Sequence, residues 1–183
     1  MSSLNAVDPA TAPDDAKRIL AAVNAQLGVT PNMFRVAANS AAALNGLVQL
    51  SGSLAKGRLN ARVREQIALA VAQTNGCDYC LSAHTYLGKQ AGLNDDDVRR
   101  ARSGDAAEPK IDAIVRLAVA IVRERGHVGA EAVVQARAAG ISNAELVEIV
   151  GNVALNVFTN YLNVVAGTEI DFPVVHAAEL SRA

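Results

Sequence analysis

The chain has 183 residues, with 17 Lys and Arg against 18 Asp and Glu and a formal net charge of -1. Its length suits one compact domain. Its composition, 51% hydrophobic and 19% charged residues, excludes a disordered chain. The balanced charge offers no field for nucleic acid or an anionic membrane surface, and two cysteines cannot make a disulfide framework.

The pattern along the chain predicts helices and almost nothing else. Prolines precede apolar-periodic runs, glycines fall where helices should stop, and no alternating strand pattern persists. We therefore predict an all-α fold, a compact multi-helix bundle of one domain over residues 1–183 with loose termini at 1–12 and 174–183. The predicted helices are 13–27, 31–38, 40–55, 60–74, 78–91, 94–103, 109–125, 129–139 and 142–166.

The last predicted helix contains an uncharged stretch, 149–168, that is long enough to span a bilayer. Four asparagines recur along it at helical spacing, and so much amide is costly in hydrocarbon. We interpret it as a buried helix of a soluble protein, whose amides tie neighbouring helices together; lining the active site is the alternative role. The N-terminus lacks a secretory signal, so we expect the reducing cytoplasm. The four amides are Asn152, Asn156, Asn160 and Asn163.

Chemistry concentrates around a Cys-x-x-Cys pair, Cys77 and Cys80, at the start of a predicted helix. Residues three apart share a helix face, so the two sulfurs can reach disulfide distance. The positive end of the helix dipole stabilises a thiolate there, and the thiolate is the nucleophile. His84 lies one turn beyond Cys80 and two turns beyond Cys77, so its imidazole is better placed to take the proton of Cys80.

Glu65 heads the apolar face of the preceding predicted helix, which predicts a partly buried carboxylate and a candidate general base. If the two helices pack together, Glu65 could orient or deprotonate His84. The pair of cysteines also has other interpretations, namely metal ligation or inert core residues. A closed zinc site needs a fourth ligand; His127 and His176 are expected to be exposed and inert, and a site of two Cys, one His and Glu65 is uncommon.

The spacing of Glu65, Cys77-x-x-Cys80 and His84 resembles the signature of the AhpD-like alkylhydroperoxidases in the carboxymuconolactone decarboxylase family. The segments 156–163 and 168–173 also resemble the ending of the peroxidase-related branch of that family. The likeness spans about residues 29–173.

This resemblance implies an all-helical homo-oligomer, a trimer or hexamer, that reduces hydroperoxides. It makes Cys80 the peroxidatic cysteine and Cys77 the resolving cysteine, with Glu65 and His84 in a proton relay. Tyr79 stands where the best-known members carry a second histidine, and tyrosine is a poor base near neutrality because its ordinary pKa is about 10.

The leading hypothesis is a cytoplasmic, thiol-dependent peroxidase that requires no cofactor and no metal. An external dithiol, thioredoxin-like or lipoyl, would restore both thiols. The alternative is a non-catalytic helical oligomer that senses redox state or binds zinc, or a decarboxylase-like family member of other activity. True decarboxylases of the wider family lack the cysteine pair, so decarboxylation is the less expected activity.

Overall fold

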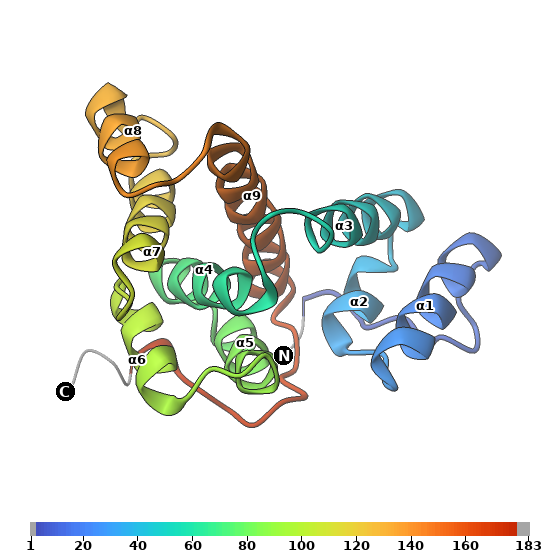
Figure 1. The fold of residues 1–183 in the computed structure, drawn as a ribbon. Helices are drawn as coiled ribbons and strands as arrows, with labels where there is room; N and C mark the ends of the chain where they lie inside the picture. Colours follow the sequence, from blue (N-terminus) through green and yellow to red (C-terminus); the bar gives the residue numbers. More distant parts are fainter. Residues whose placement is uncertain (1–2, 179–183) are drawn as a thin grey trace.

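The computed structural model describes residues 3–178, and this part of the chain contains nine α-helices and no strand. The predicted all-α class is confirmed, and each predicted helix is present with small shifts at its ends (Figure 1). The helices are α1 Asp14–Leu27, α2 Asn32–Ala37, α3 Ala41–Leu54, α4 Ala61–Asn75, α5 Asp78–Gln90, α6 Asp95–Ser103, α7 Pro109–Arg123, α8 Gly129–Ala138 and α9 Asn143–Ala166.

Local signals set where α9 begins and ends. The Ser142 side chain accepts the backbone N–H of Glu145, and the Glu145 carboxylate accepts the backbone N–H of Ser142, which completes a capping box. The helix ends at Gly167, whose φ of 62° is the left-handed conformation that glycine adopts without strain. These signals explain why the longest helix of the protein was predictable within about one residue at each end.

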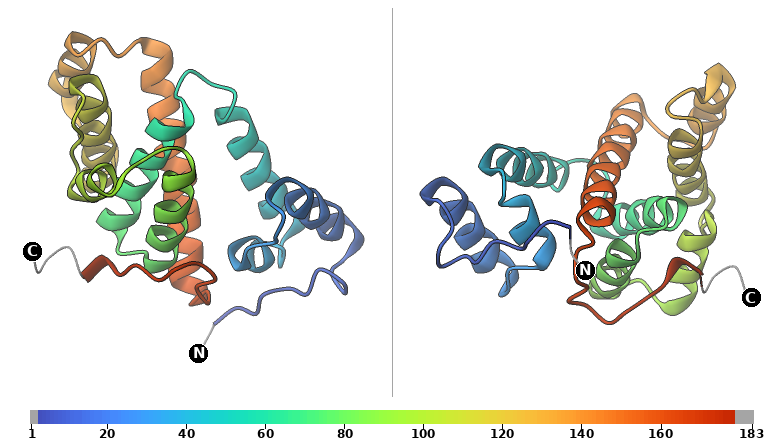
Figure 2. Two further views of the ribbon diagram at one scale, coloured as in Figure 1. Left: turned by 60° about the horizontal axis from the view of Figure 1, so that its bottom comes forward. Right: turned by 180° about the vertical axis from the view of Figure 1, so that it is seen from behind.

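Helix α9 runs through the middle of the molecule, as Figures 1 and 2 show from opposite sides. Helices α1–α3 form an N-terminal lobe on one side of it, and α4–α8 lie on the other side. Leu155 and Leu162 of α9 pack against the apolar cluster of the lobe, whereas Ile149 and Val153 belong to the cluster formed with α4 and α7. The central helix is therefore apolar on more than one face because it serves two cores.

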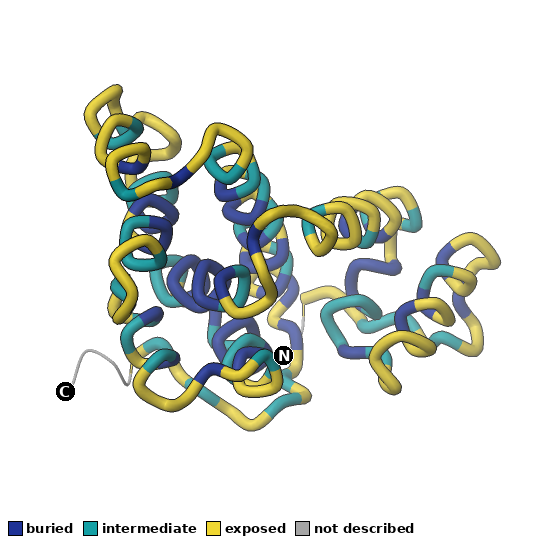
Figure 3. Tube along the Cα trace, viewed as in Figure 1, coloured by how far each residue is buried: buried dark blue, intermediate teal, exposed yellow. Residues whose placement is uncertain are grey.

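Helix α4 is the most deeply buried element near the cysteines (Figure 3). Its residues 66–72 are all buried, and it contacts α5, α6, α7 and α9. A helix segment surrounded in this way carries apolar residues all round, as α4 does in its six consecutive apolar residues 67–72. Its C-terminal end leads directly into the Cys-x-x-Cys pair.

The described parts of both chain ends are held by hydrogen bonds. In the N-terminal segment, the Ser3 N–H donates to the Ala166 carbonyl at 2.7 Å and the Val7 N–H to the Arg35 carbonyl at 3.0 Å. In the C-terminal segment, the Val175 N–H donates to Ser82 Oγ at 2.9 Å. Residues 1–2 and 179–183 of the two ends that we predicted to be loose lie outside the described residues.

Among the described helices, α9 alone has the length and composition of a membrane crossing, a test that core helices of soluble proteins also pass. Its four asparagines are all buried, and protein packs on several sides of it. This arrangement agrees with our interpretation of the stretch as a core helix.

Candidate active site

The two cysteines lie at the junction of α4 and α5. Gly76 ends α4 in the left-handed conformation, with φ 66°, and this sharp turn starts α5 at once. Cys77 is the N-cap residue of α5, and its sulfur accepts the backbone N–H of Cys80 at 3.3 Å. Cys77 and Cys80 form a disulfide, with their Cα atoms 5.4 Å apart. Both residues are buried, being 1% and 3% exposed.

Glu65 and His84 meet across the packed pair of helices α4 and α5. Glu65 Oε2 lies 2.8 Å from His84 Nδ1, and the two side chains are 19% and 22% exposed. The contact that the sequence suggested between these two residues is therefore present, and Glu65 is partly buried as expected. With Nδ1 bound to the carboxylate, the ring orientation is set and Nε2 is left as the second ring nitrogen for proton transfer.

A glycine inside α5 accounts for the close approach of the two helices at this point. Gly88 lies one turn beyond His84, and a Cβ atom there would stand 3.7 Å from Glu65 Cβ and only 2.9 Å from Leu93 Cδ1. A Cβ atom alone would meet Glu65 at an ordinary contact distance and displace the tip of Leu93, whereas a side chain larger than alanine would crowd α4 where Glu65 must reach His84. Sequence reasoning did not single out Gly88, although a glycine in a helix interior is a recognisable signal of close packing.

The four asparagines of α9 make three kinds of contact. Asn152 and Asn156 donate from Nδ2 to backbone carbonyls one turn earlier in their own helix, each at 2.8 Å. Asn160 accepts a bond from Asn75 Nδ2 at 2.9 Å and so joins α9 to α4. Asn163 Nδ2 lies 3.3 Å from Cys80 Sγ, so this residue lines the site. The expected tie to a neighbouring helix is therefore present at Asn160, whereas Asn152 and Asn156 bond within α9 instead. Asn163 has the alternative role, because it lies beside Cys80.

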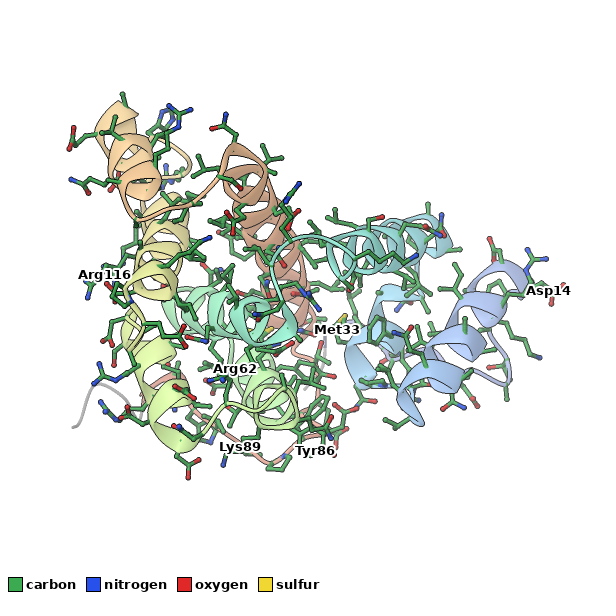
Figure 4. The ribbon with its side chains drawn as sticks, viewed as in Figure 1. Asp14, Met33, Arg62, Tyr86, Lys89 and Arg116 are labelled. Carbon is green, nitrogen blue, oxygen red and sulfur yellow. A yellow bond between two sulfur atoms is a disulfide. The ribbon has the colours of Figure 1, made fainter. Side chains whose placement is uncertain are left out.

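Tyr79, between the cysteines, is a structural anchor. Its hydroxyl donates to Asp171 Oδ1 at 2.8 Å and accepts the backbone N–H of Met33 at 3.1 Å. Burial, together with the Asp171 carboxylate, raises the pKa of Tyr79 well above its ordinary value, so the phenol stays neutral. Figure 4 shows Met33 on α2, where the N-terminal lobe faces the bundle. Tyr79 thus joins α5 to both α2 and the C-terminal segment.

The C-terminal segment, residues 169–178, crosses the start of α5. Asp78 Oδ1 accepts the Ala177 N–H at 2.8 Å, and Asp78 Oδ2 lies 2.7 Å from His176 Nδ1. Burial alone would raise the pKa of Asp78, but the Ala177 N–H and the His176 ring outweigh it, so the pKa is below its ordinary value. His176 is exposed as predicted, but it is not isolated, because the segment folds back onto α5.

The apolar side chains around the disulfide come from several elements. Met33, Ile170, Phe172 and Val175 pack against the cluster that contains Cys77 and Cys80. Within the described residues, no three His, Cys, Asp or Glu side chains gather in a way that could hold a metal ion. Two open hollows lie on the N-terminal lobe, and neither is lined by a cysteine, Glu65 or His84. We therefore identify the candidate active site from its chemistry, at the α4–α5 junction.

Comparison with known families gives one match in sequence. Residues 40–124 match the profile of the carboxymuconolactone decarboxylase family. This segment contains Glu65, both cysteines and His84. Among curated proteins, none matches the chain significantly.

Solved structures share the fold at low sequence identity. An uncharacterised peroxidase-related protein from Ralstonia eutropha JMP134, with an alkylhydroperoxidase AhpD core, is 20% identical with a TM-score of 0.83, covering 93% of this chain and 92% of that chain. A peroxidase-related protein from Silicibacter sp. TM1040 is 19% identical with a TM-score of 0.79, at coverages of 91% and 89%. The debrominase Bmp8, as a variant bound to 2,3,4-tribromopyrrole, is 17% identical with a TM-score of 0.79, at coverages of 100% and 97%.

Proposed function

We propose that this chain, which belongs to the carboxymuconolactone decarboxylase family as an AhpD-like member, is a thiol-dependent peroxidase. The observation that carries the proposal is the Cys77–Cys80 disulfide at the start of α5, with His84 one turn beyond Cys80 on the same helix and Glu65 of α4 in contact with His84. A dithiol that closes into a disulfide at a helix N-terminus, with an acid–base pair one turn away, supplies what peroxide reduction needs.

The reaction starts from the reduced pair. His84, oriented by Glu65, takes the proton of Cys80, and the thiolate attacks the terminal oxygen of the hydroperoxide. An S–O bond forms and the O–O bond breaks, so Cys80 becomes a sulfenic acid and the alkoxide leaves with the proton from His84. The Cys77 thiol then attacks the sulfenic sulfur, which forms the disulfide and releases water. An external dithiol reduces the disulfide by exchange and is itself oxidised.

The two sulfurs have different surroundings, which supports unequal roles. The Cys77 sulfur is the helix cap and accepts the Cys80 N–H, whereas the Cys80 sulfur accepts a bond from the Asn163 amide. His84 lies one turn from Cys80 and two turns from Cys77. We therefore assign peroxide attack to Cys80 and resolution to Cys77.

The burial of both cysteines favours a reductant whose dithiol is carried on a slim group. With residue exposures of 1% and 3%, an attacking thiol must enter between the apolar side chains that cover the disulfide. A lipoyl arm or a small dithiol is slim enough to do so, whereas a thioredoxin-like protein needs a wider opening of the cover. We propose a lipoyl-type dithiol as the reductant and the cytoplasm as the compartment.

Two single-cysteine variants test the function. Reduced wild-type protein should lose two thiols per peroxide consumed and turn over with dihydrolipoamide. Cys77→Ser should form a sulfenic acid on Cys80 and stop after one event, and Cys80→Ser should form none. A sulfenic acid on Cys77 in the Cys80→Ser protein would reverse the assignment.

Other outcomes would point to other functions. Stoichiometric zinc with no peroxide consumption would support the alternative of a zinc-binding or redox-sensing oligomer. Disulfide formation coupled to bromide release from 2,3,4-tribromopyrrole, without peroxide consumption, would instead indicate reductive debromination, the activity named for a structural neighbour.

We also propose that the chain assembles as a homo-oligomer, a trimer or hexamer, through the exposed apolar face of α9. This face has no charge from residue 149 to 166, so a second copy can cover it without burying unpaired ions. It consists of Val150, Phe158, Tyr161, Val164 and Val165, and Val147 lies one turn before it.

Light scattering tests the assembly with a matched pair of variants. Val150→Glu, at a residue 53% exposed on the α9 face, should shift the protein to monomers because it places a charge in the interface. Val134→Glu, at a residue 56% exposed on α8, should leave the assembly intact. A wild-type monomer at micromolar concentration would overturn the proposal.

A further inference from the structure

Asn163 stands apart from the other buried asparagines of α9 because its amide reaches a reacting atom. Its Nδ2 lies 3.3 Å from Cys80 Sγ, and the two residues are 4% and 3% exposed. Its Oδ1 is also buried and has no hydrogen-bond partner among the described residues. An unpartnered buried carbonyl oxygen is costly, so its persistence beside a nucleophile points to a bond made with a ligand.

The amide is the polar group that α9 contributes at this sulfur. The helix carries no charged residue from 149 to 166. The charged and titratable side chains near the start of α5 come from other elements, namely Glu65 of α4, Asp78, Tyr79 and His84 of α5, Arg102 of α6, and Asp171 and His176 of the C-terminal segment. An amide N–H donor stabilises a thiolate without adding a counter-charge that a substrate would have to displace.

We propose that Asn163 is a catalytic residue with two separate functions toward Cys80 and its substrate. Its Nδ2 donates to the thiolate, and its free Oδ1 accepts the terminal O–H of the hydroperoxide. This inference rests on the proposed peroxidase function and assigns the group that recognises the peroxide end of the substrate.

Amide geometry supports both functions at once. The oxygen and nitrogen of one amide are about 2.3 Å apart, so a hydroxyl bound to Oδ1 at about 2.8 Å lies within contact distance of the sulfur that Nδ2 holds. The oxygen that carries the hydroxyl proton is the one that the thiolate attacks. The S–O bond forms there, the O–O bond breaks, and the departing alkoxide takes its proton from His84 as in the scheme above.

Two reactions of the same thiol separate the functions. Alkylation by iodoacetamide requires the Cys80 thiolate but no hydroxyl acceptor, whereas oxidation by a hydroperoxide requires both. On a Cys77→Ser background, which leaves one thiol, Asn163→Leu should slow alkylation near neutral pH about tenfold, since a bond to a charged group is lost. It should slow peroxide oxidation by a further fivefold or more, because the acceptor is lost as well.

Two further variants distinguish these functions of Asn163 from an effect on folding. Asn156→Leu is the matched control, because Asn156 is buried on the same helix but bonds to the Asn152 carbonyl; it should reduce thermal stability and leave both rates unchanged. Asn163→Asp keeps the side-chain shape and its acceptor oxygens but loses the N–H donor and places a negative charge beside the thiolate. It should slow alkylation more than Asn163→Leu does.

The outcomes distinguish this inference from the proposed function. Equal alkylation rates in Asn163→Leu and Asn156→Leu proteins would overturn the thiolate function. An equal loss in alkylation and oxidation would overturn the acceptor function. Absence of peroxide reaction in the Cys77→Ser protein itself would overturn both the peroxidase function and the acceptor assignment, and the alkylation rates would still decide whether Asn163 stabilises the thiolate.

Discussion

Replacing Glu65 by glutamine removes one negative charge from the site and leaves its shape unchanged. Glutamine can still accept the Nδ1–H of His84 through its amide oxygen, so the ring should keep its place. The carboxylate that stabilises a protonated His84 is lost, and proton transfer from Cys80 becomes harder. The fold and the assembly should survive, because glutamine has the shape of glutamate and no apolar contact is deleted.

The size of the effect follows from the 2.8 Å contact. A hydrogen bond to a charged group contributes about 1.5–3 kcal/mol, and the neutral bond that glutamine keeps contributes about 0.5–1.5 kcal/mol. The weakened contact alone therefore costs about 1–1.5 kcal/mol, which is roughly a tenfold effect, and the rest of the loss comes from the impaired general base. General acid–base groups contribute about 10²–10⁴-fold in enzymes. We therefore expect Cys80 oxidation near neutral pH to fall about a hundredfold.

The assay follows peroxide oxidation of reduced protein by stopped-flow over a range of pH, with thermal unfolding on the same sample. Raising the pH should recover much of the lost rate, because hydroxide can then form the thiolate without His84. Glu148→Gln is the matched control: Glu148 accepts the backbone N–H groups of Arg58 and Leu59 and contacts neither cysteine. Normal oxidation of the Glu65→Gln protein at neutral pH, or loss of stability with unchanged reactivity per folded molecule, would refute the reasoning.

Two further predictions concern stability. Lys110, and then the Ser142 backbone and hydroxyl, lower the pKa of Glu145 from 4.5 to about 2. A lowered carboxyl pKa adds stability that is complete above pH 4.5 and is lost as the pH falls to about 2. Glu145→Gln should therefore make the melting temperature fall less steeply with pH in that interval. An equally steep acid profile in the variant would contradict this. Gly88→Val should destabilise the protein by about 2 kcal/mol through overpacking against Leu93 and Glu65, which lowers the melting temperature by about 4–8 °C. It should also slow Cys80 oxidation. A variant as stable and as reactive as wild type would show that the packing of α4 against α5 does not depend on this glycine.

The sequence by itself determined the secondary structure and the chemical centre. Residues close in sequence determine where a helix begins and ends, as Ser142 and Glu145 do for α9, because capping groups bond backbone atoms within one turn. Cys77, Cys80 and His84 lie on one helix, so their spacing alone shows which side chains share a face. The Glu65–His84 contact was predictable only as a condition, since it needed α4 to pack against α5.

Only the tertiary structure decided what surrounds the sulfurs. The spacing of the four asparagines shows that they share a face of α9, but not that Asn163 meets Cys80 while Asn156 bonds within its own helix. Likewise, the residues around Tyr79 and Asp78 in the sequence do not predict that Tyr79 bonds to Asp171 and Asp78 to His176, because these partners lie more than ninety residues away. The helical period specifies which residues share a face of a helix. Which atoms of two helices meet depends on the rotation of each helix about its axis and on the distance between the axes, and both are set by packing over the whole contact.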